Sequence, residues 1–249
     1  YTHAWAQKYG WLWQIPTQKR MGCGYVYCDH YLNPQQAQKE IEKTLGHSIE
    51  PQNDIKFESG RLEKFWAKNV MTIGLSSGFI EPLEATSIHA TILQANHFIE
   101  NYYKEHMPFE CNLLQDQYNK EMSAMHEQIK DFIVFHYITP RKDTPFWVES
   151  SSPKRWSKRL QELMEIWKYR MPRSVDYVLD KTNNFYFIGS TLWFQIALGM
   201  KSFNSEIATQ ELKDYGLYEV TEKYYDVITK GGQEVLPYLY HTNDYYKTL

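Results

Sequence analysis

The chain has 249 residues, of which 43% are hydrophobic, 16% aromatic and 23% charged, and its formal net charge at pH 7 is −3. This length allows one large domain or two small ones, and the small net charge argues against a broad nucleic-acid-binding surface. No apolar run reaches the length of a transmembrane helix, and the start shows no basic-then-apolar signal segment. The cysteines Cys23, Cys28 and Cys111 form neither a paired framework nor a zinc spacing, so we expect a reducing, cytoplasmic setting and no metal site.

Two strands are predicted at the start of the chain, over residues 9–16 and 22–28, joined by a polar turn. Trp11 and Trp13 alternate with Leu12, so both indoles should face the same side of the first strand. Packing of this pair beneath a helix is the simplest structural role.

The next elements are a capped helix and a third strand. Asn33 as the cap and Pro34 at the first helical position predict a helix that runs to about Leu45 and ends at Gly46. Residues 55–62 predict another strand, turned by a Ser-Gly pair.

The stretch over residues 69–90 is the most informative part of the chain. Residues 70–73 form an apolar run of the length of a buried strand, and the small residues of 74–78 let a ligand or another backbone approach closely. A helix should follow, with Glu84 to Ser87 in its first turn and its end near Lys104. A strand, a small-residue turn and a helix N-terminus can bind an anion, although an ordinary strand-to-helix connection explains the shape equally well. The helix is predicted from the spacing of its apolar residues, which are Ile88, Ile92, Ala95, Ile99 and Tyr102.

Beyond about residue 105 the pattern is helical throughout. Helices are predicted over residues 118–136, 153–171, 191–200, 206–215 and 221–230. His126 and His136 lack partners at metal-ligand spacing, so we expect surface or partly buried histidines. Several aromatic residues in this region could hold a flat substrate, although each is more typical of a core position: Phe185, Tyr186, Phe187, Trp193, Phe194 and the tyrosines from Tyr215 to Tyr246.

Four sequence motifs occur in order between residues 10 and 90. Residues 10–16 have the sequence GWLWQIP, residues 22–27 GCGYVY, residues 57–69 FESGRLEKFWAKN, and residues 74–90 GLSSGFIEPLEATSIHA. These segments resemble the WxWxIP, GxGYVYS, FxxGRxxxxWxxN and GLASxFxEPLESTGI motifs of the flavin-dependent halogenases. Beyond about residue 105 the resemblance to that family is limited to helix pattern and aromatic content.

The resemblance implies an oxidoreductase that uses reduced FAD, oxygen and a halide ion (chloride, bromide or iodide) to form hypohalous acid. The acid would halogenate an indole- or phenol-like aromatic substrate. It also implies a separate flavin reductase that supplies FADH2. We expect neither nucleic acid nor a membrane as a partner, and a homo-oligomer is possible.

The resemblance also assigns roles to individual residues. Glu84 is the predicted catalytic residue, which orients the electrophile and accepts the proton released from the ring; its simpler role is a first-turn acid that interacts with the helix dipole. The backbone N–H groups of Thr86 and Ser87 are predicted to bind the halide, and Leu75 and Ile88 match positions that line the flavin. The WxWxIP match implies that four residues lie beside the passage between flavin and substrate: Trp11, Trp13, Ile15 and Pro16.

Two residues depart from the family pattern at this site. Ala85 stands where the family usually has Ser, and Ser87 where it usually has Gly. Both changes leave the backbone amides in place, so we expect them to affect halide preference and rate more than the class of reaction.

The predicted fold is α+β or α/β. Residues 1–105 should form the second half of an FAD-binding, monooxygenase-like sheet domain, and residues 106–249 an all-helical substrate-binding region. The GxGxxG turn that binds a dinucleotide pyrophosphate does not occur in the chain, and the family's catalytic lysine belongs to the same missing portion. Since the first residue is Tyr1, we expect the chain to be the later half of a longer polypeptide.

Two other classes of function remain open. A flavin-dependent aromatic monooxygenase would share the fold and release a hydroxylated product, although it gives no reason for the WxWxIP motif. A non-catalytic binding protein would use the aromatic helices as its binding surface.

Overall fold

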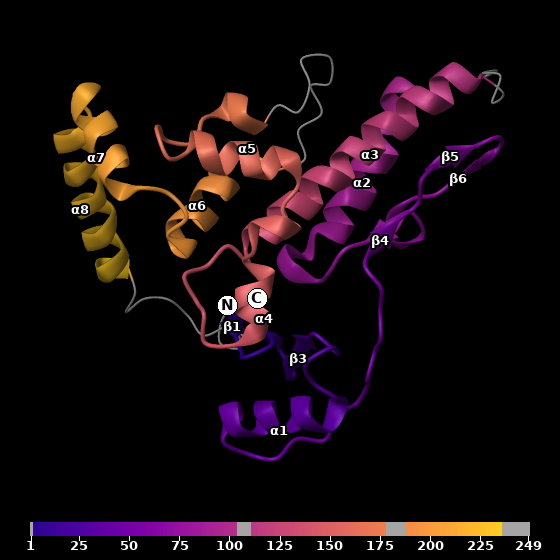
Figure 1. Cartoon of the computed structure of the whole chain (residues 1–249), viewed down its shortest axis with the longest axis horizontal. Helices are drawn as coiled ribbons and strands as arrows, with labels where there is room; N and C mark the ends of the chain where they lie inside the picture. Colours follow the sequence, from indigo (N-terminus) through magenta and orange to yellow (C-terminus); the bar gives the residue numbers. More distant parts are fainter. Residues whose placement is uncertain (1, 104–110, 178–187, 236–249) are drawn as a thin grey trace. The chain divides into compact units, whose positions relative to one another are not determined.

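The computed structural model describes residues 2–103, 111–177 and 188–235, which form a mixed structure of helices and small sheets (Figure 1). The chain divides into two compact units. Unit 1 draws on Tyr1–Ile49, Trp167–Met171 and Asn204–Leu249, and unit 2 on Glu50–Ile166 and Pro172–Phe203. These units do not coincide with the predicted division at residue 105, which concerned function as well as folding and stays a prediction. In the described ranges, no helix combines the length and the apolar character needed to cross a membrane.

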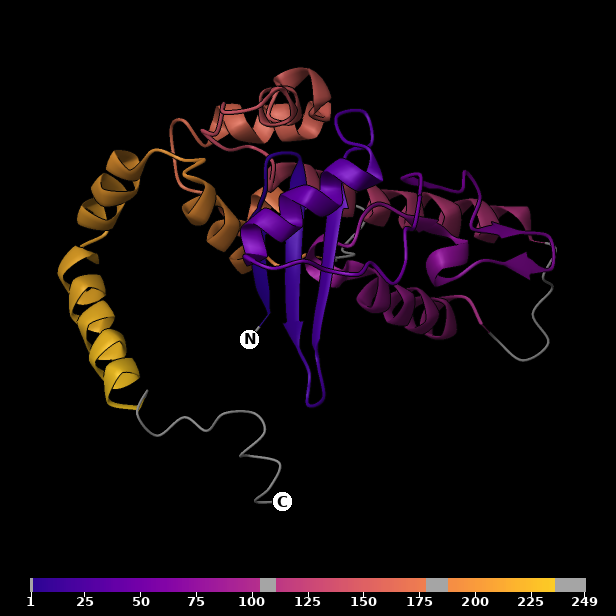
Figure 2. The ribbon, with the colours of Figure 1, turned by 90° about the horizontal axis from the view of Figure 1, so that it is seen from below.

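Unit 1 contains a three-stranded antiparallel sheet of β1 (His3–Ala6), β2 (Gly10–Pro16) and β3 (Met21–Tyr27), in that order. The strands predicted over residues 9–16 and 22–28 are confirmed as β2 and β3, whereas β1 was not predicted. Helix α1 (Pro34–Leu45) lies across one face of the sheet (Figure 2).

The first two family motifs pair with each other along this sheet. Trp11 lies opposite Val26 and Trp13 opposite Gly24, so the WxWxIP strand and the GxGYVY strand form one hairpin. The strand alternation buries Leu12 completely on the opposite face from the two indoles. The pairing also requires glycine at Gly10, because a Cβ atom there would lie 1.9 Å from the Val26 carbonyl oxygen.

Helix α1 confirms the prediction from its capping residues. The Asn33 side chain accepts a hydrogen bond from the Gln36 backbone N–H, and the Gln36 side chain accepts one from the Asn33 backbone N–H. This reciprocal arrangement satisfies two of the free amides at the helix start. Gly46 ends the helix in the left-handed conformation, with φ of 79°.

The strands of unit 2 are shorter than predicted. They form two two-stranded sheets, with two residues in each strand. The strands β5 (Trp66–Ala67) and β6 (Val70–Met71) form a hairpin, and β4 (Gly60–Arg61) pairs with β7 (Gly78–Phe79) on either side of it in the chain. Only Gly60–Arg61 of the strand predicted over 55–62 is present, and Ile55 is exposed. The predicted burial of the run at 70–73 is wrong at Val70, which is 60% exposed, because β6 belongs to a two-stranded ribbon and not to a covered sheet.

Helix α2 (Thr86–Asn101) is preceded by two short 3₁₀ turns, η1 (Gly74–Ser76) and η2 (Leu83–Ala85). It therefore begins at Thr86 instead of Glu84. It buries Ala90 and Gln94, whereas most of the apolar residues that predicted the helix are exposed on it: Ile88 71%, Ile92 52% and Ile99 60%.

Helix α3 (Asn112–Phe135) forms the core of unit 2 and lies beside α2. The predicted 4-3 spacing is confirmed, because all its members are buried: Tyr118, Met122, Met125, Ile129, Phe132 and His136. The contact with α2 is also polar, since Glu121 accepts hydrogen bonds of 2.6 Å from both His97 and Tyr102.

The remaining helices follow in chain order. Unit 2 continues with α4 (Pro145–Ser150), η3 (Pro153–Arg155), α5 (Lys158–Ile166), η4 (Ser174–Tyr177) and α6 (Ser190–Met200), and unit 1 with α7 (Ser205–Asp214) and α8 (Tyr218–Val235). Helix α4 was not predicted, and the single helix predicted over 153–171 is instead η3 followed by α5. Of the proposed substrate aromatics, Trp193 is buried and Phe194 is exposed. The three at 185–187 and the tyrosines beyond residue 235 lie outside the described residues.

Candidate active site

The backbone around Glu84 adopts an unusual conformation. Glu84 and Ala85 both have positive φ, 63° and 48°, in the left-handed region that non-glycine residues seldom adopt. Such a residue costs about 1–3 kcal/mol, and such residues cluster at functional sites. The two residues are the last of η2 and directly precede α2, so the strained bend sets the direction of the Glu84 side chain relative to the start of α2.

The Glu84 carboxylate contacts a buried histidine. His136 Nε2 lies 3.1 Å from Glu84 Oε1, with the histidine side chain 7% exposed and the glutamate side chain 37% exposed. His136 follows directly after the last residue of α3. The hydrogen bond from His136 lowers the pKa of Glu84, and this effect exceeds the opposing effect of partial burial.

A second carboxylate lies close to the same histidine. Burial raises the pKa of Glu81 to about 7, although the hydrogen bond from Tyr137 and the charge of His136 both act to lower it. The Tyr137 hydroxyl lies 2.9 Å from both carboxylate oxygens of Glu81 and donates to them. Two neighbouring carboxyl groups therefore have pKa values shifted in opposite directions, which is a common arrangement in active sites.

Aromatic residues of helix α4 pack against the ring of Tyr137. The Tyr137 ring lies 6.0 Å from Phe146 and 5.9 Å from Trp147, and Trp147 is almost completely buried. The guanidinium of Arg141 covers the Trp147 ring at 4.5 Å and also makes a bidentate contact with Asp143. This packing fixes the ring of Tyr137 and therefore the direction of its bond to the Glu81 carboxylate.

The start of α2 offers backbone donors beside Glu84. No side chain caps this helix, and Ala85 at the cap position has no polar group to do so. The first-turn amides of Thr86 and Ser87 have no carbonyl partner within an α-helix, and the helix dipole adds positive potential there. The predicted halide donors thus lie two and three residues after Glu84 in the chain.

Turn η1 is held against α2 by glycine and amide contacts. A Cβ atom on Gly74 would lie 2.7 Å from Thr91 Oγ1, and the Gly74 N–H donates to Gln94 Oε1 at 2.9 Å. Leu75 on η1 and Ile88 on α2 are each 71% exposed. These two side chains are therefore free to contact an apolar ring, as their predicted role in lining the flavin requires.

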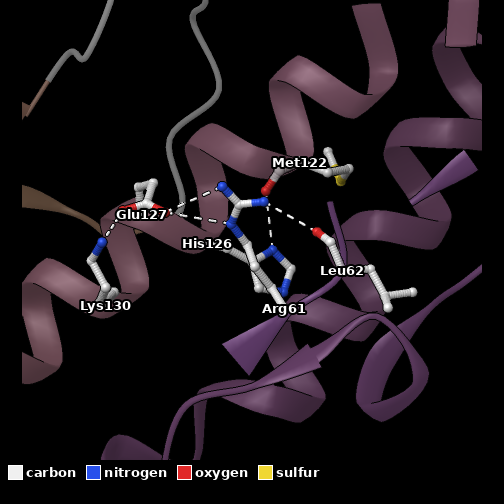
Figure 3. Close-up of polar contacts among 6 residues, drawn as sticks. All are labelled: Arg61, Leu62, Met122, His126, Glu127 and Lys130. Atoms are coloured by element: carbon white, nitrogen blue, oxygen red, sulfur yellow. Dashed lines mark hydrogen bonds and ion pairs between the residues drawn. The ribbon is translucent and has the colours of Figure 1, made fainter. Parts of the chain in front are cut away.

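The arginine of the third motif anchors β4 on α3. Arg61 makes an ion pair of 3.3 Å with Glu127, which also pairs with Lys130 (Figure 3). His126 lies next to this ion pair, and its Nδ1 donates to the Met122 carbonyl oxygen at 3.0 Å. Burial lowers the pKa of His126, and the charge of Arg61 lowers it further.

Unit 2 contains five of the nine predicted site residues: Leu75, Glu84, Thr86, Ser87 and Ile88. The motif residues Trp11, Trp13, Ile15 and Pro16 lie on β2 in unit 1, and their position beside the passage between flavin and substrate stays a prediction.

Three site residues were not predicted: Glu81, His136 and Tyr137. The expectation that His126 and His136 are surface or partly buried is wrong, because both are only 5% exposed. A signal was available in the sequence, since His136 continues the buried stripe of α3. A buried imidazole needs hydrogen-bond partners, and that need points to a polar site.

The family model described as tryptophan halogenase matches residues 1–212. The tryptophan 6-halogenase SttH of Streptomyces toxytricini is 34% identical over 178 residues, which cover 70% of this chain and 33% of that protein. ThaL of Streptomyces albogriseolus, also a tryptophan 6-halogenase, is 29% identical over 260 residues, which cover 96% of this chain and 47% of ThaL.

Solved structures of tryptophan halogenases are similar in fold to this chain. The crystal structure of SttH superposes on all of this chain with a TM-score of 0.80 at 25% identity, and the chain covers 47% of it. A tryptophan halogenase from Shewanella frigidimarina gives a TM-score of 0.76 at 25% identity, with 92% of this chain covered. The chain therefore spans about half the length, or less, of the relatives it matches.

Proposed function

The chain belongs to the tryptophan halogenase family, and on that premise we propose that the complete protein halogenates an aromatic substrate with hypohalous acid made from FADH2, oxygen and halide. The observation that carries the proposal is the position of Glu84. Its carboxylate is held by a strained bend directly before the uncapped N-terminus of α2 and is hydrogen-bonded to a buried histidine.

In the proposed reaction the ring carbon attacks the halogen of hypohalous acid, so a carbon–halogen bond forms as the halogen–oxygen bond breaks. The oxygen leaves as water after it gains a proton, and the ring carbon loses its own proton. The Glu84 carboxylate orients the acid and accepts the ring proton, a role that suits an acid whose lowered pKa keeps it ionised at neutral pH.

We further propose that the backbone N–H groups of Thr86 and Ser87 bind the halide. Unpaired amides at a helix N-terminus favour an anion, and the side chain of Thr91 supports this turn by donating to the Ser87 carbonyl oxygen at 2.7 Å. Reduced FAD, when bound, supplies the reaction of oxygen with the halide.

The described residues fit one part of FAD. Leu75 and Ile88 present exposed apolar surface close to the start of α2, which suits a flat isoalloxazine ring. The chain offers no GxGxxG turn for the pyrophosphate. The proposal therefore assigns to this chain the contact with the ring and not the contact with the phosphates.

The relatives are named for tryptophan, so tryptophan is the first substrate to test, followed by other indoles and phenols. The complete protein would be incubated with FAD, a flavin reductase, NADH and bromide, and the products would be analysed by mass spectrometry. A brominated product supports the proposal. A hydroxylated product would favour a monooxygenase, and an unchanged substrate across the panel would favour a binding protein.

A further inference from the structure

The two ring nitrogens of His136 have fixed and different partners. Nδ1 lies 2.7 Å from the Phe132 carbonyl oxygen, one turn earlier in α3. Nε2 lies 3.1 Å from Glu84 Oε1. The ring is 5% exposed and packs at a right angle on Phe132, with 4.8 Å between ring centroids, so it cannot easily turn to exchange these partners.

These contacts fix how many protons the pair holds. A carbonyl oxygen only accepts hydrogen bonds, so Nδ1 must carry a proton. In the neutral ring Nε2 would then present a lone pair to Glu84, and an ionised carboxylate also presents lone pairs only. A stable contact of 3.1 Å therefore requires one further proton between Nε2 and the carboxylate.

The surroundings of the ring decide where this proton resides. Two carboxyl groups, Glu84 and Glu81, come from the segment before α2, and both sense the charge of His136. The other titratable group nearby is the hydroxyl of Tyr137, which donates to Glu81. The geometric contact of Nε2 is with Glu84, whose side chain is 37% exposed and therefore partly open to water, which favours the ionised carboxylate. With Glu84 ionised, the shared proton belongs to Nε2.

We propose that His136 is a positioning residue for the halogenation reaction: as an imidazolium it fixes Oε1 of Glu84 and leaves Oε2 for the electrophile and the ring proton. The inference rests on the proposed function of Glu84. It adds that the carboxylate is oriented by a charged donor whose own direction is set by the Phe132 carbonyl oxygen. It also assigns the buried cation the task of keeping Glu84 ionised.

The chain provides a matched control in His126. Like His136 at the end of α3, this histidine belongs to the buried side of α3 and is 5% exposed. Its Nδ1 likewise donates to the carbonyl oxygen four residues earlier, at 3.0 Å. Its neighbour is the Arg61 ion pair instead of Glu84 (Figure 3). If halogenation activity falls only because a buried histidine has been replaced, it should fall equally in variants of His136 and of His126.

The first test compares His136→Ala, His136→Gln and His126→Gln in the complete protein. Loss of a charge-assisted hydrogen bond should lower kcat for halogenation by about 10- to 100-fold in His136→Ala, with KM for the aromatic substrate and flavin reoxidation little changed. His136→Gln places an amide N–H near the position of Nε2 and should recover part of the loss. His126→Gln should keep kcat within about threefold of wild type. Equal losses in kcat at both positions, or no loss in His136→Ala, would overturn the inference.

The second test measures protonation and does not need a halogenated product. In the complete protein labelled with [15N]histidine, the His136 signal is identified by its absence in His136→Gln. Both ring nitrogens should show protonated chemical shifts at pH 7. In Glu84→Gln the amide can donate to Nε2, so the ring should become neutral with Nε2 unprotonated. A neutral His136 in the wild-type protein contradicts the inference even if halogenation occurs, whereas an imidazolium in a protein that halogenates nothing would contradict the proposed function alone.

Discussion

At the scale of single residues, the proposed chemistry depends most directly on Glu84. Glu84→Gln keeps the size of the side chain and a hydrogen bond to His136 but removes the base. A positioned acid or base contributes about 10²–10⁴-fold to a rate, so we expect a loss of that size in halogenation while flavin reoxidation stays near normal. Product formation and oxygen consumption in the complete protein would be measured side by side. A loss below tenfold would contradict the catalytic role.

Glu81 should make the stability of the protein depend on pH. Its pKa is about 7 in the folded protein, against an ordinary value of 4.5 for a glutamate that is open to water, so the folded protein holds the proton more strongly. The resulting stability is complete below pH 4.5 and is lost as pH rises through 7, by about 3 kcal/mol at most. Glu84, whose pKa is lowered, acts with the opposite sign: its contribution is lost only as pH falls towards acid values.

Glu81→Gln should remove the pH dependence that Glu81 causes. The neutral amide keeps a partner for Tyr137 but cannot ionise, so the variant should gain in Tm relative to wild type between about pH 5 and pH 8. Thermal unfolding at the two pH values would show the change. A Tm difference between variant and wild type that is the same at both would mean that Glu81 titrates normally in the folded protein.

The sequence led to Glu84 through its motif and not to His136, and the reason is physical. Motif spacing reports residues that are close along the chain, whereas the contact between Glu84 and His136 joins η2 to the end of α3. The apolar spacing of α3 correctly placed His136 on the buried side. The Glu84 carboxylate supplies the hydrogen-bond partner that a buried His136 needs. Which residue supplies it depends on how the segments of unit 2 pack, and no local sequence pattern specifies that packing.

At the scale of secondary-structure elements, Asn119 connects α3 to the β5–β6 hairpin. Its Oδ1 accepts hydrogen bonds from the backbone N–H groups of Phe65 and Trp66, at 2.7 and 2.8 Å, and its Nδ2 donates to the Trp66 carbonyl oxygen at 2.8 Å. Asn119 is 8% exposed, and both hairpin residues are almost completely buried. One side chain thus satisfies three backbone groups that water does not reach easily.

Asn119→Ala should therefore destabilise unit 2 strongly. Each buried polar group left unsatisfied costs about 1–3 kcal/mol, so we expect a total loss of about 3 kcal/mol or more and a fall in Tm of about 6–12 °C. Gln117→Ala, on the exposed side of the same helix, removes a single hydrogen bond to Glu121 and serves as the control. Similar Tm values for the two variants would show that the hairpin does not depend on Asn119.

The elements differ in how well the sequence specifies them. Helix α1 follows from its own caps, and α3 from a long buried stripe, because both signals are local. The strand predicted over 55–62 failed because β4 is defined by pairing with β7, from which it is separated by the entire β5–β6 hairpin. Helix α2 was found by an apolar spacing whose members are largely exposed in this structure, so the spacing gave the helix but not the face that it buries.

At the scale of the whole molecule, the four family motifs are distributed over both compact units. The first two form the β2–β3 hairpin of unit 1, and the other two contain β4, β5, β7 and the start of α2 in unit 2. The mixed class of fold was predictable from the alternation of strand and helix patterns. The composition of unit 1 was not, because it joins residues before 50 with residues after 203, and periodicity carries no information about such distant contacts.

This chain is assigned contacts with the flavin ring but contains no GxGxxG turn for the pyrophosphate, so the 249-residue chain by itself should bind FAD only weakly. The two flavin contacts assigned to it are the side chains of Leu75 and Ile88, and burying an apolar side chain of this size contributes about 1.5–3 kcal/mol. Association costs about 4–15 kcal/mol in lost motion, and the chain has no GxGxxG turn to offset this cost through the pyrophosphate. We therefore expect a Kd of about 1 mM or weaker.

The chain and the complete protein would each be titrated with oxidised and reduced FAD, and binding would be measured by flavin fluorescence and calorimetry. The complete protein should bind FAD at least a hundredfold more tightly than the chain. Stoichiometric binding by the 249-residue chain at micromolar concentration would show that it contains a phosphate-binding site that its sequence does not reveal.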